Sequence, residues 1–62
     1  MPRFRCIAMD DISTDAGERH RATPGARPVI VVAVDEDDAV DKSVAKFAHL
    51  SHDFIKVDRV AS

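Results

Sequence analysis

The sequence predicts a small α+β domain with element order β-β-α-β: a three-stranded, largely antiparallel sheet carrying one helix on one face. Three features predict it. Alternating apolar residues occupy 3–9, a β-branched run occupies 28–34, and a helix-periodic segment at 35–51 precedes a last strand-like segment at 53–60. With only 62 residues, the chain has room for one domain over 1–62.

Residues 3–9 predict the first strand. Because neighbouring side chains of a strand point to opposite faces, Phe4, Cys6 and Ala8 share one face. The other face then carries Arg3, Arg5, Ile7 and Met9. Two aspartates at 10 and 11 end this pattern.

Residues 10–28 predict a long polar loop. The segment contains both glycines and two of the three prolines, and Ile12 is its one large apolar residue. Nineteen residues is long for a connection in a compact domain. Two alternatives therefore stay open: part of the segment extends the flanking strands, or the segment is mobile.

Residues 28–34 give the clearest strand signal. Five of these seven residues are β-branched, and Pro28 stands at the start, where a strand tolerates proline. Both faces are apolar, which is typical of a strand covered on both sides. One face carries Val29, Val31 and Ala33, and the other carries Ile30, Val32 and Val34.

Residues 35–51 predict the helix. Val40, Val44, Phe47 and Ala48 follow the i, i+4, i+7, i+8 spacing of an apolar stripe. Asp35 or Asp37 can cap the amino end. Asp38 and Lys42 form an i, i+4 pair in the favourable order.

Residues 53–60 predict the last strand, and the helix is the crossover that leads to it. A right-handed crossover makes this strand parallel to the second strand and antiparallel to the first. We expect the first strand in the middle, which gives the order 2-1-3. A mixed sheet with the second strand beside the third is the alternative.

One helix can cover only one face of this sheet, so apolar side chains are left on the other. We expect an interface there, formed by Ile30, Val32, Val34, Ile7, Met9 and Phe54. Burying such a face against a second copy favours a homodimer, through this face or through the edge of the 29–34 strand. The alternative is that the long loop folds back over the open face.

Charged side chains suggest further partner contacts. Arg19, Arg21 and Arg27 are candidates for an acidic partner. The acidic helix start, with Asp37, Asp38 and Asp41, permits a phage-type inhibitor that blocks a larger nucleic-acid-handling complex. A formal net charge of −2 and the lack of interleaved aromatic residues argue against binding of nucleic acid by the chain itself.

Composition argues against most chemistry. His49 and His52 are candidate metal ligands, and a small metal- or nucleic-acid-binding regulator would use them. The structural alternative is two exposed histidines stabilised by the helix dipole at a helix end. No cofactor motif and no catalytic cluster is visible, so we expect a non-enzymatic protein without a cofactor. Cys6 stands alone, and no apolar run is long enough to cross a membrane. The sequence therefore predicts a cytoplasmic interaction or regulatory module that binds itself and an unidentified protein.

Overall fold

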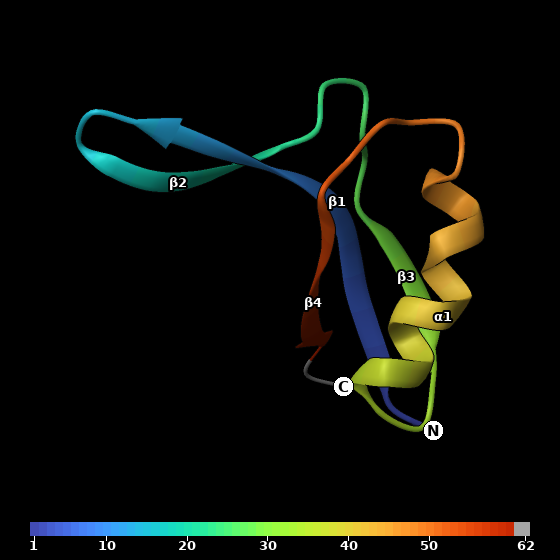
Figure 1. The fold of residues 1–62 in the computed structure, drawn as a ribbon. Helices are drawn as coiled ribbons and strands as arrows, with labels where there is room; N and C mark the ends of the chain where they lie inside the picture. Colours follow the sequence, from blue (N-terminus) through green and yellow to red (C-terminus); the bar gives the residue numbers. More distant parts are fainter. Residues whose placement is uncertain (61–62) are drawn as a thin grey trace.

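The computed structural model describes residues 1–60, with Thr14 described by its backbone only. It shows an α+β domain with an antiparallel sheet and one helix, which confirms the predicted fold class. The elements in chain order are β1 (Arg3–Thr14), β2 (Gly17–Ala22), β3 (Val29–Val32), α1 (Glu36–Phe47) and β4 (Phe54–Val60). Figure 1 shows β1 running through the middle of the sheet.

Strand β1 is the centre of the sheet and pairs antiparallel with all three other strands. Arg3 pairs with both Val32 of β3 and Val60 of β4, so these two strands lie on opposite edges of β1. Met9 pairs with both β2 and β4, so β2 lies on the same edge as β3. The order β3-β1-β4 is the predicted order 2-1-3, and the mixed-sheet alternative is wrong.

The prediction of a polar loop over 10–28 is wrong for most of its length. Strand β1 continues to Thr14, and β2 returns antiparallel beside it after a two-residue turn. Gly17 closes this turn at φ 117°, a conformation that favours glycine. Only residues 23–28 connect β2 to β3 without regular structure. The open alternative, in which the segment extends a flanking strand, is therefore the correct one.

The hairpin formed by residues 10–22, here called the arm, projects from the body of the domain (Figure 1). Strand β4 reaches only as far as Met9, so the arm is a two-stranded ribbon. All six residues of β2 are exposed. The alternative, in which this segment folds back over the open sheet face, is not realised at Ile30, Val32 and Val34, which stay exposed.

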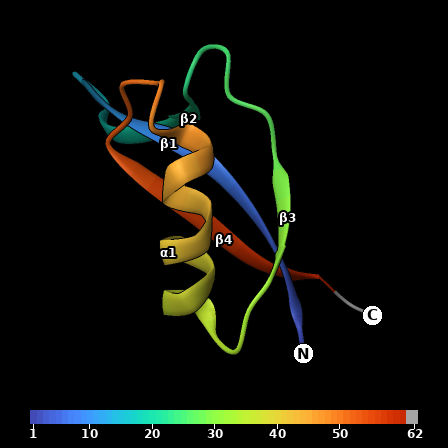
Figure 2. The same cartoon turned by 90° about the vertical axis from the view of Figure 1, so that its right-hand side faces the viewer.

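Helix α1 lies over one face of the sheet (Figure 2), and the core lies between the two. Its fully buried apolar residues are Phe4, Cys6 and Ala8 of β1, Ala33 after β3, and Ala39 and Phe47 of α1. Val29 and Val31 of β3 and Ile55 and Val57 of β4 pack against them. The predicted alternation of β1 and β3 is thereby confirmed.

The helix buries a stripe that includes Phe47 of the predicted one but otherwise consists of Ala39 and Ser43. Ala39, Ser43 and Phe47 are buried, whereas Val44 is 46% exposed. Small residues let the helix approach the sheet closely, and the Cys6 thiol lies 3.9 Å from the Ala39 carbonyl oxygen, to which it donates. The hydroxyl of Ser43 donates to the Val40 carbonyl at 3.0 Å, which satisfies this buried polar group.

Helix α1 has one of the two predicted N-caps and is shorter than predicted. Asp35 is the N-cap, and its carboxylate accepts a hydrogen bond from the Asp38 backbone N–H at 2.8 Å, as predicted. The helix ends at Phe47, short of the expected residue 51. Over the described residues, its twelve residues are too few and too polar to cross a bilayer.

Candidate interaction surface

The face of the sheet opposite α1, here called the uncovered face, carries three large exposed apolar side chains. Ile30 is 55% exposed, Val32 is 49% exposed and Val34 is 63% exposed. They follow the alternation that buries Val31 and Ala33 toward the helix. Half of the predicted interface set therefore lies on the surface at one margin of the sheet.

The other half of the predicted set is only partly accessible. Ile7, Met9 and Phe54 are half-buried, and Met9 and Phe54 are cross-strand partners at the root of the arm. The His20 ring meets the Phe54 ring edge-on, with centroids 5.1 Å apart. The arm thus shields this second apolar group in part.

His20 was not among the predicted site residues. Its Nδ1 lies 2.7 Å from Asp11 Oδ1, directly across the ladder of the arm. The signal that could have found it is charge complementarity: the aspartates at 10 and 11 come to lie opposite Arg21 and His20 once the chain turns back.

Charged side chains divide the apolar side chains of the uncovered face. In the register of the sheet, Arg3 stands between Val32 and Val60, and Arg5 stands between Ile30 and Asp58. Because registered neighbours share a face, this surface mixes apolar and charged side chains across the strands. Lys56 of β4 stands beside Ile7 in the same way. Such a mixed surface suits a protein interface, where an apolar patch is combined with polar contacts.

The outer edge of β3, the predicted alternative interface, is partly occupied by helix side chains. Lys42 Nζ donates to the Val32 carbonyl at 2.8 Å, and Asp38 Oδ2 accepts from the Val34 N–H at 3.0 Å. Lys42 and Asp38 also form the predicted ion pair at 3.1 Å. The hydrogen bond from Val34, followed by that from Lys42, lowers the pKa of Asp38.

The acidic residues proposed for partner binding have different surroundings. Asp37 and Asp41 are exposed on the helix, but Asp38 is bound to Val34 and Lys42. Its carboxylate holds the connection between β3 and α1 in place through the hydrogen bond from the Val34 N–H. Two of the three predicted acids are therefore free to meet another molecule, and they share the helix with Lys42 and Lys46.

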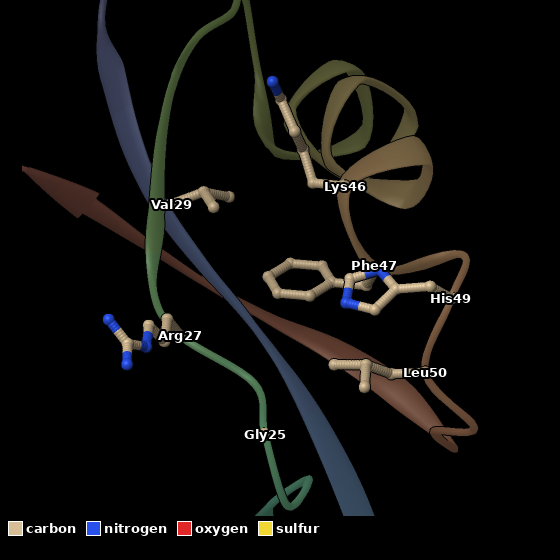
Figure 3. A pocket seen from close by; sticks show the side chains of 7 residues that line it. All are labelled: Gly25, Arg27, Val29, Lys46, Phe47, His49 and Leu50. Carbon is tan, nitrogen blue, oxygen red and sulfur yellow. The ribbon is translucent and has the colours of Figure 1, made fainter.

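The predicted arginine cluster is divided between two places. Arg19 and Arg21 lie on the same face of β2, and Arg27 lies in the connection to β3. Arg27 borders a shallow cavity of about 230 Å³ between this connection and the end of α1. In Figure 3 the Arg27 and Lys46 side chains extend in different directions, and His49 lies beside Phe47. This space is smaller than a typical ligand pocket, and its basic groups do not converge.

The two candidate metal ligands, His49 and His52, have separate surroundings. His49 borders the cavity, whereas His52 Nδ1 lies 2.9 Å from the Leu50 carbonyl and its ring packs against Phe47. Among residues 1–60 no three side chains of histidine, cysteine, aspartate or glutamate gather in a metal-binding arrangement. Cys6 is a free thiol in the core.

Comparison of the chain with protein-family models, with curated proteins and with solved structures gives no match. The surface on which large exposed apolar side chains gather is the uncovered face.

Proposed function

We propose that this protein is a small, non-enzymatic protein–protein interaction module of the cytoplasm that acts as a homodimer. The uncovered face of its sheet would hold a second protein, with regulation of that protein as the outcome. The observation that carries the proposal is the exposure of Ile30, Val32 and Val34 side by side at one margin of this face. A cluster of this kind is typical of a binding surface.

Energetics support a covered rather than a bare surface. A large aliphatic side chain gains roughly 1.5–3 kcal/mol when it is fully buried. A domain of 62 residues has a small core, and this one is built largely from alanines and two phenylalanines. Burial of the three side chains against another chain would therefore be a large addition to its stability.

The alternative of an inhibitor acting through the acidic helix has weaker support. Asp38 is already bound within the chain, and Lys42 and Lys46 interrupt the negative surface. The alternative of a metal-binding regulator meets the separate surroundings of His49 and His52. The side chains of Ile30, Val32 and Val34 on the uncovered face, by contrast, are exposed and close to one another along the chain.

Side-chain footprinting tests the proposal. Photochemical carbene labelling of Ile30, Val32 and Val34 is measured in dilute purified protein, in concentrated protein and in an extract of cells producing it. We expect labelling to fall in at least the extract, because another protein covers the face. Val44 is the matched control, since it is 46% exposed but lies on α1, and its labelling should not change. Equal labelling of the face under all three conditions would contradict the proposal.

A further inference from the structure

We propose that the outer edge of β4 pairs antiparallel with β4 of a second copy, about a two-fold axis at Val57. This inference rests on the proposed function, because it names the surface that forms the homodimer. It replaces the edge of β3, which the sequence suggested, with the opposite edge of the sheet.

The outer edge of β4 carries free backbone groups. Carbonyls of even-numbered β1 residues point to the β3 and β2 edge, since Pro2 accepts from Ala33 and Ala8 accepts from Thr23. Met9, an odd-numbered residue, accepts from Asp53 on the opposite edge. The residues of β4 paired with odd-numbered β1 residues therefore bond inward, and those between them bond outward.

Three residues of β4 are left with outward N–H and C=O groups: Ile55, Val57 and Arg59. Within residues 1–60, β1 is the one strand that pairs with β4, and no described side chain bonds to this edge. Figure 1 shows β4 on the side of β1 away from β3. An edge of this kind is a template for another strand.

The sequence of β4 is complementary to itself in one register. With Val57 opposite Val57 of the second copy, Lys56 faces Asp58 of the second copy and Asp58 faces Lys56 of the second copy. Phe54 then faces Val60 of the second copy on the same side of the sheet. The three outward-bonding residues meet each other in this register, which gives about six hydrogen bonds between the strands.

The charged pairs between the copies would also extend the cross-strand pair of Arg5 and Asp58 within each chain. Asp58 stands beside Arg5 in the register of the sheet, so it would lie between Arg5 and Lys56 of the second copy. Within one chain Lys56 Nζ is 3.9 Å from Asp58 Oδ2, a long contact between two exposed groups. Directly opposite cross-strand charges of unlike sign are the closer and more favourable arrangement.

Neighbouring registers of β4 are disfavoured by the same charges. Outward groups can also meet when the axis moves by one residue to position 56 or 58. Lys56 would then face Lys56 of the second copy, or Asp58 would face Asp58 of the second copy. Like charges in directly opposed positions destabilise a sheet, so the register centred on Val57 is favoured over these two neighbours.

The other two edges are less suited to self-pairing. The outward groups of β2 belong to Glu18, His20 and Ala22, and every register that joins at least two of these residues sets Arg19 or Arg21 opposite an arginine of the second copy. On β3, the Val32 carbonyl that pairing would need is already bound by Lys42. The edge of β4 has neither obstacle.

Two domains fit side by side in this arrangement. The axis is perpendicular to the sheet, so both helices lie on one side and both uncovered faces lie on the other. Helix α1 packs against β1, β3 and β4. The two central β1 strands would be three strand spacings apart, roughly 14 Å, which leaves room for helices that pack at roughly 8–10 Å.

A charge exchange followed by sedimentation velocity tests the pairing. Lys56→Asp and Asp58→Lys each place like charges opposite one another twice in the dimer. We expect each to weaken dimerisation at least about tenfold, and the double variant to recover most of it, because unlike charges again face each other between the copies. The remaining difference comes from the lysine at position 58, which then stands beside Arg5 of its own chain. Lys46→Asp, on the exposed side of α1, is the matched control and should dimerise as the unmodified protein does.

Mixed-cysteine trapping tests the register. Lys56→Cys and Asp58→Cys chains are mixed and oxidised; Cys6 is fully buried and does not compete. The two new thiols face each other in a mixed dimer, whose second charged pair is intact, so we expect a disulfide there. Either variant alone sets its thiols roughly 8 Å apart by backbone position, too far to bridge. Trapping of either variant alone as efficiently as the mixture would overturn the register.

The results separate this inference from the proposed function. If charge exchange leaves dimerisation unchanged, or the unmodified protein is a monomer, the β4 pairing is wrong, while the footprint of Ile30, Val32 and Val34 still decides the binding face. If the exchange behaves as expected but those three side chains are labelled equally everywhere, the dimer stands and the binding face falls. Circular dichroism of each variant confirms that it is folded.

Discussion

Small side chains decide how closely the helix approaches the sheet. Ala39 and Ser43 are fully buried where a longer side chain would hold α1 away from Cys6. The sequence pattern favoured the larger Val40 and Val44, because a stripe is recognised by its apolar bulk. Close packing against a flat sheet rewards small residues instead, and this preference is invisible until the partner surface is known.

Overpacking at Ala39 should therefore be costly. We expect Ala39→Leu to lower the free energy of unfolding by about 1–3 kcal/mol, because the added atoms meet the thiol of Cys6 and the sheet beneath it. Urea denaturation measures the change. Ala45→Leu introduces the same side chain at an exposed position of the same helix and should leave stability nearly unaltered. A loss at Ala45 as large as that at Ala39 would argue against close packing as the cause.

Asp38 gives the connection from β3 to α1 a pH dependence. Its pKa lies below the ordinary value of 3.8, owing first to the hydrogen bond from Val34 and then to Lys42. A lowered pKa in the folded state stabilises the fold above the unfolded-state pKa, and this contribution disappears as the pH falls through the folded-state value. The unmodified protein should thus exceed Asp38→Asn in stability at neutral pH and approach it in strong acid.

Thermal unfolding of both proteins between neutral pH and pH about 2 checks this behaviour. Asp37→Asn is the control, since it removes the same charge from the same helical turn and leaves the Val34 and Lys42 contacts in place. A stability gap for Asp38→Asn that persists unchanged in acid would show that its carboxylate charge does not contribute.

Among the secondary-structure elements, the two strands of the arm are the hardest to predict from the sequence. Strand β2 is exposed along its whole length, and Ile12 is the one large apolar residue of the arm, so the arm lacks the apolar alternation by which strands are recognised. Their cross-strand pairs of aspartate with arginine and histidine appear only after the turn has been placed. Strand β3, by contrast, can be predicted from the sequence alone, because a run of β-branched residues favours a strand independently of the neighbouring strands.

The arm should open without unfolding the body. We expect Gly17→Ala to destabilise the arm by about 1–2 kcal/mol, since φ there is 117° and only the backbone conformation opposes the added Cβ. Amide hydrogen exchange should quicken in residues 10–14 and 17–22 and stay slow in β4. Glu18→Ala is the control on the same strand. Equal acceleration in the core would show that the arm and the body unfold as one unit.

For the complete domain, the sequence already indicates that a single helix leaves one face of the sheet uncovered. One helix and a strand with two apolar faces already imply an open surface, and the structure leaves Ile30, Val32 and Val34 exposed. The sequence could not show which sheet edge is blocked. Lys42 and Asp38 reach the edge of β3 only because the chain turns tightly from that strand into α1.

Sedimentation equilibrium of the unmodified protein at micromolar concentration tests whether the chain forms a homodimer. A homodimer predicts a mass twice that of the 62-residue chain, falling toward a single chain on dilution, together with a melting temperature that rises with protein concentration. A folded monomer at every concentration, with a melting temperature independent of concentration, would contradict it.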